Sequence, residues 1–79
     1  MELIDRIVNK LYEEFGYETE SGYDIRSWSD DEITFCGGEE DFSKICDFIC
    51  DEFDDVKDCE FYYEVDGGIV METRIELET

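Results

Sequence analysis

The chain contains no histidine. This absence excludes a Ser-His-Asp triad, an imidazole general base and every metal site that relies on histidine ligands. A glycine-rich phosphate-binding loop is also missing, because Gly37–Gly38 and Gly67–Gly68 are isolated pairs in turn contexts. Carboxylates are spread along the whole chain, so no single pair stands out as a general acid and base. We therefore expect a protein that is not an enzyme and binds no cofactor.

Long apolar runs are missing as well. The longest comprise only a few residues, which is too short for a membrane-spanning helix. Met1 leads directly into an amphipathic pattern with acids at Glu2 and Asp5, which is not the pattern of a secretory signal peptide. We therefore expect a cytoplasmic protein without a membrane partner. In that compartment the 4 cysteines are expected to be reduced.

Basic residues are scarce. The chain has 6 Lys and Arg against 25 Asp and Glu, which gives a formal net charge of -19. Two carboxylates about 6 Å apart repel by roughly 0.7 kcal/mol in bulk water, so many such pairs oppose folding. DNA, RNA and anionic membranes carry the same sign of charge and would be repelled. A basic protein surface would be attracted, which predicts a basic protein as the partner.

Apolar residues, in contrast, are sufficient for a folded core. The hydrophobic fraction is 42% and the aromatic fraction is 15%, which argues against disorder despite the charge. A chain of 79 residues forms one domain, residues 1–79, whose core is small.

Two segments have the pattern of amphipathic helices. In residues 2–15 apolar side chains recur at three- and four-residue steps, and Gly16 follows where a left-handed helix stop is expected. Residues 40–55 repeat this pattern, and the acids at their start suit the positive end of the helix dipole. The buried stripes are predicted to consist of Leu3, Ile4, Ile7, Val8, Leu11, Tyr12 and Phe15 in the first helix and of Phe42, Ile45, Cys46, Ile49 and Phe53 in the second.

Between the helices, residues 23–36 predict a β-hairpin with its turn at residues 29–31. Two registers are open. Pairing Ile25 with Ile33 leaves Trp28 in the loop, whereas pairing Trp28 with Ile33 turns Ile25 outward.

Residues 57–65 and 69–78 alternate between apolar and polar side chains, which predicts a second hairpin. A two-residue loop would place apolar side chains opposite the wrong face. We therefore predict a three-residue loop, residues 66–68, with a glycine in the left-handed conformation. This register sets Glu60 opposite Arg74, a favourable cross-strand pair.

The order of these segments is αββαββ, which predicts an α+β fold. A four-stranded, mainly antiparallel sheet with two helices packed on one face would bury every apolar stripe.

The cysteines do not have the spacing of a zinc site. Zinc ligands usually come in two close pairs on tight turns, whereas only Cys46 and Cys50 are close here, one turn apart on a predicted helix. We interpret the cysteines as small buried apolar residues. The acidic run 51–58 lacks the alternating oxygen ligands and central glycine of a calcium loop. No dedicated metal site is predicted.

Acidic residues line the side of the second predicted helix that lies opposite its apolar stripe. Successive members would be roughly 5–6 Å apart, a separation similar to that of neighbouring phosphates on a nucleic-acid strand. Acids also crowd the carboxyl ends of both helices, where negative charge costs about 0.3–1 kcal/mol each. A local rule broken without benefit to folding indicates a functional surface. The stripe consists of Glu40, Asp47, Asp51 and Asp54, with Asp55 and Asp58 nearby.

The outer face of the predicted sheet repeats this pattern. Its carboxylates surround Tyr62, and an aromatic ring among carboxylates can pack against arginine. The acids on this face are Glu60, Glu64, Glu72, Glu76 and Glu78.

A short, strongly acidic α+β domain without catalytic residues resembles the phage-encoded inhibitors that mimic nucleic acid. Anti-CRISPR proteins are the best-populated group, and uracil-DNA glycosylase inhibitors and anti-restriction proteins behave similarly. The resemblance is one of type, covers the whole chain and rests on no family motif. It implies a basic nucleic-acid-binding partner, such as a Cas nuclease or its guide-RNA complex, in the cytoplasm of a phage host. It also implies inhibition by steric competition with target DNA.

On this interpretation the partner-binding residues are exposed carboxylates. The main contacts are expected at Asp47, Asp51, Asp54, Asp55 and Asp58, and further contacts at Glu40, Asp30, Asp31, Glu72 and Glu76.

Two other interpretations remain open at this point. The first is an acidic protein–protein interaction module, which an exposed apolar patch containing Trp28, Phe48 or Tyr62 would favour. The second is the acidic coat of a halophilic protein, which would require molar salt for folding.

Overall fold

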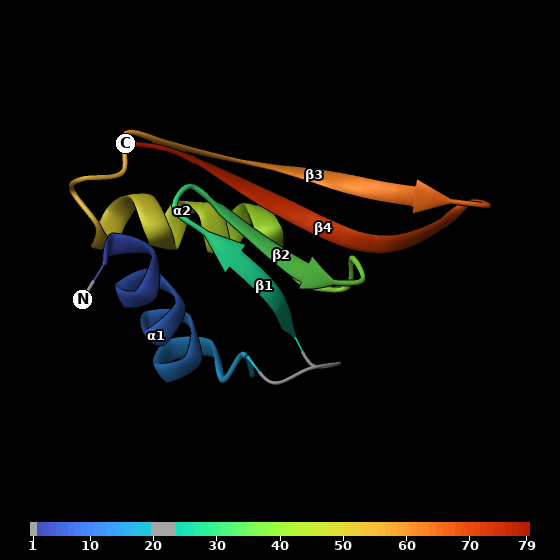
Figure 1. Ribbon diagram of the computed structural model, residues 1–79, viewed down its shortest axis with the longest axis horizontal. Helices are drawn as coiled ribbons and strands as arrows, with labels where there is room; N and C mark the ends of the chain where they lie inside the picture. Colours follow the sequence, from blue (N-terminus) through green and yellow to red (C-terminus); the bar gives the residue numbers. More distant parts are fainter. Residues whose placement is uncertain (1, 20–23) are drawn as a thin grey trace.

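The strands and helices follow the predicted order. The structure is a computed structural model, and it describes residues 2–19 and 24–79. The strands form one antiparallel sheet in the order β1-β2-β4-β3, which confirms the α+β fold and the four-stranded sheet (Figure 1). The elements are α1 (Leu3–Phe15), β1 (Ile25–Ser29), β2 (Glu32–Cys36), α2 (Phe42–Glu52), β3 (Asp58–Asp66) and β4 (Ile69–Glu78).

Both helices cover the same face of the sheet, as predicted, and the other face is open to solvent (Figure 1). The core lies between the two layers. Aliphatic side chains from both helices meet aliphatic and aromatic side chains of the sheet, which removes their apolar surface from water. The fully buried members include Ile7 and Leu11 of α1, Ile45 and Ile49 of α2, and Ile33, Phe35 and Ile75 of the sheet.

The end of α1 is as predicted. Gly16 has a φ of 73°, in the left-handed region, and its backbone N–H donates to the carbonyl of Tyr12. A glycine takes up this conformation without the cost that a side chain would add.

The prediction of α2 was too long at both ends. The helix begins at Phe42, because the carboxylate of Asp41 caps it by accepting the N–H of Lys44 at 3.2 Å. It ends at Glu52, because Phe53 is extended and the chain then turns to bury both Phe53 and Val56. Burial of these two side chains outweighs continuation of the helix. The acids at positions 40, 54 and 55 therefore lie outside the helix that was expected to carry them.

The first hairpin combines the two alternative registers. Trp28 pairs with Ile33, yet Ile25 is fully buried and pairs with Phe35. A β-bulge at Arg26 inserts one residue and turns Ile25 back toward the core. The turn is shorter than predicted, because Ser29 belongs to β1. Tyr23, which the predicted hairpin included, lies outside the described residues.

The prediction of a three-residue loop in the second hairpin was wrong. Asp66 pairs with Ile69, so Gly67 and Gly68 form a two-residue turn, and both have positive φ. A bulge in β4 at Met71 then restores the correct faces, because Glu64 pairs with Glu72 beyond it. Arg74 consequently lies opposite Tyr62 and not opposite Glu60.

Candidate interaction surface

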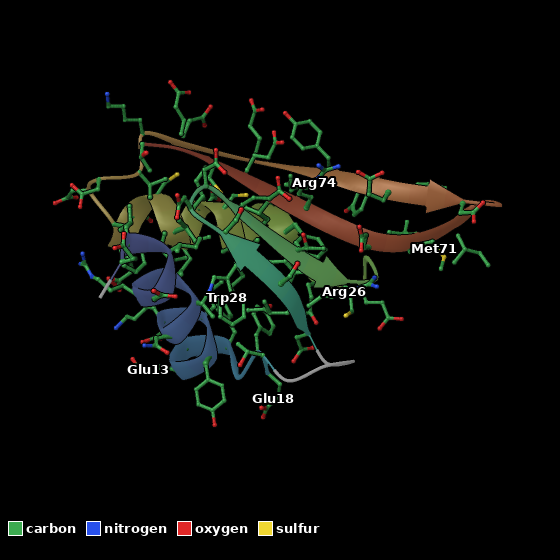
Figure 2. All side chains as sticks on the ribbon, in the orientation of Figure 1. Glu13, Glu18, Arg26, Trp28, Met71 and Arg74 are labelled. Carbon is green, nitrogen blue, oxygen red and sulfur yellow. The ribbon has the colours of Figure 1, made fainter. Side chains whose placement is uncertain are left out.

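The open face of the sheet is almost entirely polar. Side chains of β2, β3 and β4 alternate, so the neighbours of the buried residues point away from the helices (Figure 2). We call this surface the acidic sheet face. It comprises Glu32, Asp58, Glu60, Tyr62, Glu64, Glu72, Arg74, Glu76 and Glu78.

Carboxylates on this face are arranged in rows across the strands. Glu76 of β4 lies directly opposite Glu32 of β2 on one side and Glu60 of β3 on the other. Asp58 likewise lies opposite Glu78. Like charges directly opposite each other destabilise a sheet. The arrangement therefore opposes folding and indicates a separate use for these carboxylates.

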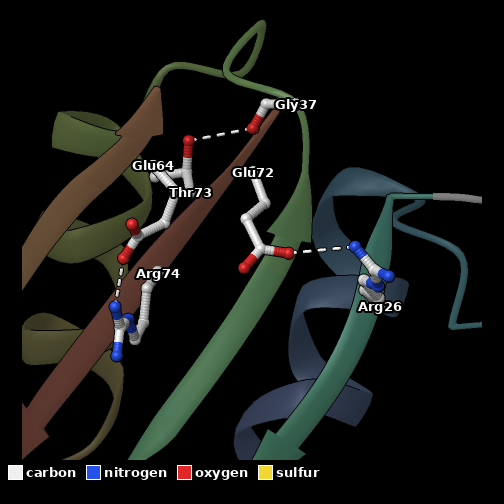
Figure 3. A network of polar contacts seen from close by, with 6 residues as sticks. All are labelled: Arg26, Gly37, Glu64, Glu72, Thr73 and Arg74. Atoms are coloured by element: carbon white, nitrogen blue, oxygen red, sulfur yellow. Dashed lines mark hydrogen bonds and ion pairs between the residues drawn. The ribbon is translucent and has the colours of Figure 1, made fainter. Parts of the chain in front are cut away.

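Arginines offset only part of this charge. Arg74 forms ion pairs with Glu64 and, at 3.9 Å, with Glu32. These carboxylates raise the pKa of Arg74, mainly through the hydrogen bond to Glu64. The guanidinium of Arg26 binds Glu72 at 3.0 Å (Figure 3). Three of the carboxylates on the face are thus engaged by arginines from within the chain.

The row of Glu32, Glu76 and Glu60, which we call the central row, has an arginine at one end, where Arg74 lies 3.9 Å from Glu32. Among the described residues, no ion pair involves Glu60 or Glu76. Glu60 instead accepts a hydrogen bond of 2.5 Å from the hydroxyl of Tyr62. This bond, followed by the charge of Glu60, raises the pKa of Tyr62 and keeps its hydroxyl protonated. The row therefore presents carboxylates that a basic partner can bind.

The exposed side of α2 meets the acidic sheet face along the free edge of β3. A hollow of about 540 Å³ lies there, and we call it the edge groove. Asp47 of α2 and Glu60 of β3 both line it. The remaining lining residues are Ser43, Cys46, Cys59, Phe61 and Tyr62.

Two thiols form the floor of the edge groove. The Sγ atom of Cys59 donates a hydrogen bond to that of Cys46 at 3.1 Å. This bond lowers the pKa of Cys46 and, together with burial, raises the pKa of Cys59. All four cysteines are free. Within residues 2–19 and 24–79, no three potential ligands gather closely enough to hold a metal ion.

The structure brings several of the predicted contact residues together. Asp47 and Asp51 are exposed on α2, and Asp58 begins β3 beside them. Negative charge from all three reaches the thiol of Cys50 and helps to raise its pKa, after the larger effect of burial. Asp58 and Glu76 belong to the acidic sheet face, whereas Asp47 and Asp51 lie on α2, on the other side of the sheet.

Other predicted contacts lie at the end of the molecule where β4 finishes. The β1–β2 turn contains Asp30 and Asp31, and the carbonyl of Asp31 accepts the N–H of Leu77 at 2.8 Å. Asp54 and Asp55 are exposed in the turn that follows α2. All of these carboxylates are accessible, but they are not aligned on one helical stripe.

Two predicted contacts are already engaged within the fold. Glu72 holds Arg26, as described above. Glu40 is half-buried beside Tyr17, where burial and then the charge of Glu40 raise the pKa of Tyr17 to about 12. These two residues are less available to a partner than the exposed aspartates.

Exposed apolar side chains gather elsewhere, at the tip of the β3–β4 hairpin, which projects beyond the helices (Figure 1). They do not include Trp28, Phe48 or Tyr62, the residues whose exposure was expected to favour a protein–protein interaction module. Trp28 donates to Asp5 beside α1, and Tyr62 stands on the acidic sheet face. The exposed fractions at the tip are 49% for Tyr63, 60% for Val65, 66% for Ile69 and 57% for Met71.

Sequence reasoning missed two parts of this surface. Glu32 was not assigned to it, although its alternation with Ile33 in a strand would place it on the open face. The thiol pair that lines the edge groove could not be found, because no pattern along the chain connects Cys46 with Cys59.

No helix in the described part of the chain is both long and apolar enough to cross a membrane. Comparison with known proteins gives no significant match to a family model, a curated protein or a solved structure.

Proposed function

We propose that this protein is an inhibitor of the anti-CRISPR type that mimics nucleic acid. It binds the basic DNA- or RNA-binding surface of a defence nuclease, such as a Cas effector, and sterically blocks target DNA. Arginines of such a surface form charge-assisted hydrogen bonds with phosphates, and carboxylates can accept the same bonds. No chemistry is required of the protein itself, so it acts without catalysis.

The observation that carries this proposal is the central row of the acidic sheet face. Glu32, Glu76 and Glu60 lie side by side on three neighbouring strands. A sheet fixes their spacing, so a partner need not order them on binding, which lowers the entropic cost of association. Carboxylates of the same row repel one another until a cation arrives, which favours a basic partner further.

A second candidate function is an acidic protein–protein interaction module. It is favoured by the apolar tip of the β3–β4 hairpin, where Val65, Ile69 and Met71 are more than half exposed. A cluster of exposed apolar side chains of this kind is typical of the central part of protein interfaces. Inhibitors of the anti-restriction and glycosylase-inhibitor types would use the same acidic sheet face on another enzyme.

The test of the proposed function is competition with DNA. The tagged protein is used to capture partners from a bacterial lysate at low and at high salt, and each captured protein is purified. We expect a nuclease whose binding to a labelled target duplex is abolished by a stoichiometric amount of this protein. Capture should weaken steeply as salt rises, because exposed charges are screened. A captured partner that still binds its DNA in the presence of the protein would contradict the proposal.

Matched variants assign the surface. The double substitution Glu60→Gln and Glu76→Gln should weaken inhibition about tenfold or more, because it removes the unpaired carboxylates of the central row. The control is Glu13→Gln with Glu14→Gln, which changes net charge equally. Both control residues lie on α1. Figure 2 shows Glu13 on the side of the molecule away from the acidic sheet face. If the two double variants weakened inhibition equally, only the net charge of the protein would matter. The triple variant Asp47→Lys, Asp51→Lys and Asp54→Lys tests the predicted contacts on α2 and in the turn that follows it.

A further inference from the structure

The free edge of β3 has two chemically different faces. Its side chains alternate, so Asp58, Glu60, Glu64 and Asp66 point to the open face around Tyr62, whereas Cys59 and Phe61 pack toward the core. Tyr63 and Val65 continue the apolar face toward the hairpin tip. In the part of the chain that the structure describes, β3 is the last strand of the sheet and pairs with β4 alone. Half of its backbone donors and acceptors therefore point away from β4, toward a strand that could be added. The N–H of Cys59 donates to the carboxylate of Asp58 at 2.9 Å, so an added strand would compete with that bond.

The edge groove lies at this free edge. Cys59, Glu60, Phe61 and Tyr62 all line it, although successive residues of a strand point to opposite faces. One hollow can meet four consecutive residues only where it wraps around the edge of the strand. The opposite wall is formed by Ser43, Cys46 and Asp47, which share one face of α2 because they are three and four residues apart.

A second copy of this chain does not suit the edge. An antiparallel pair of β3 strands centred on Tyr62 would set Glu60 opposite Glu64 and Asp58 opposite Asp66. Four like-charged pairs would then face each other across the new ladder, and such pairs destabilise it. The charges thus prevent self-association while leaving the edge open to a strand of the opposite charge.

We propose that the edge of β3 binds an extended segment of the basic partner as an added strand. The segment alternates basic and apolar residues. Its basic side chains lie over the acidic sheet face, beside Glu60 and Glu64, and its apolar side chains enter the edge groove against Phe61 and the two thiols. Backbone hydrogen bonds to β3 supply affinity, and the alternating pockets supply specificity. This binding mode deepens the proposed function and rests on it, because it assumes a basic protein partner.

The experiment uses a synthetic peptide and the intact protein. The probe is the capped peptide Lys-Val-Lys-Leu-Lys-Val-Lys, which alternates charge and apolar side chains. The control is Lys-Lys-Lys-Lys-Val-Leu-Val, which has the same composition and charge without the alternation. We expect calorimetry at about 0.15 M salt to give a Kd at least about tenfold lower for the alternating peptide. Hydrogen exchange should slow at alternate amides of β3, the ones that point away from β4.

Two serine-to-phenylalanine substitutions at different places on the sheet and helix locate the binding site of the peptide. Ser43→Phe fills the edge groove without changing charge, and it should weaken the alternating peptide about tenfold or more. Ser27→Phe makes the same change on β1, at the opposite edge of the sheet, and should have no effect. Glu60→Gln should weaken binding severalfold and reduce its dependence on salt. Equal affinity of the two peptides, or slowed exchange confined to β1, would overturn the inference.

The outcome also separates this inference from the proposed function. Suppose that Ser43→Phe displaces target DNA from a captured nuclease as well as the unmodified protein does. In that case the groove inference fails and the proposed function stands. If the alternating peptide binds at β3 but the captured partner binds no nucleic acid, the groove inference is supported and the proposed function fails.

Discussion

At the scale of single residues, the local environment changes what an acid or a thiol can do. Glu60 and Glu64 lie on the same face of one strand, yet Glu64 is bound by Arg74 and Glu60 has only the hydroxyl of Tyr62. A sequence cannot distinguish them. Each faces a glutamate of β4, and Arg74 lies opposite Tyr62 between them, so the difference arises from the direction in which the Arg74 side chain reaches. The same holds for Glu40, whose half-buried position beside Tyr17 follows from the fold.

Tyr17 gives a prediction about stability at high pH. Its pKa is raised from 10.0 to about 12, first by burial and then by Glu40, so the folded state favours the neutral phenol. Because this pKa is raised, the stability that the neutral Tyr17 phenol gives to the folded state is complete below pH 10. It is lost as pH rises toward 12. Urea unfolding at pH 9 and pH 11.5 should therefore show a larger loss for the unmodified protein than for Tyr17→Phe.

The control for this measurement is Tyr12→Phe, because more than half of the Tyr12 side chain is exposed. This variant should lose as much stability between the two pH values as the unmodified protein does. An identical loss in all three proteins would show that the environment of Tyr17 does not penalise its ionisation.

At the scale of elements, periodicity located every helix and strand, but it did not locate the irregularities. The apolar stripe of α1 and its stop at Gly16 follow from the sequence, except that Tyr12, which was predicted to be buried, is 52% exposed. The bulges at Arg26 and Met71 do not, because an inserted residue is stabilised by contacts with neighbouring strands and by burial of Ile25. The three-residue loop was predicted because strict alternation was assumed along both strands, with no bulge to correct the register.

The two-residue turn between β3 and β4 gives a prediction at this scale. Gly67 has a φ of 59° and Gly68 a φ of 80°, as in the hairpin turn that prefers Asn followed by Gly. Gly67→Asn should leave stability unchanged or raise it by a few tenths of a kcal/mol, because asparagine tolerates this conformation. Gly68→Val should lower it by about 1–2 kcal/mol, because a β-branched residue does not tolerate it.

Urea unfolding of the two single variants checks this prediction. Neither position has an atom within 4 Å of an added Cβ, so a difference between them reports backbone conformation and not crowding. A loss at Gly67→Asn as large as that at Gly68→Val would contradict the two-residue turn.

At the scale of the whole molecule, the charge is distributed in a way that folding alone does not explain. Composition predicted a basic partner, and the pattern predicted an acidic open face. The exact surface depended on the pairing of strands, which brings Glu32, far away in the sequence, into one row with Glu76 and Glu60. The edge groove also exists only in the fold, because it joins α2 to the free edge of β3.

A trade-off between stability and binding follows from the central row. Glu76→Gln removes the middle charge, so it should raise the free energy of unfolding by about 0.5–1 kcal/mol at low salt. The gain should shrink as salt rises, because screening already weakens the repulsion. Glu64→Gln is the contrast, since it removes the ion pair with Arg74 and should give no gain.

A loss of stability in Glu76→Gln would show that the row is not repulsive. If the variant is more stable and still inhibits its partner as well as before, the acids serve solubility and not recognition. If the gain in stability accompanies weaker inhibition, the row is retained for binding at a cost to folding.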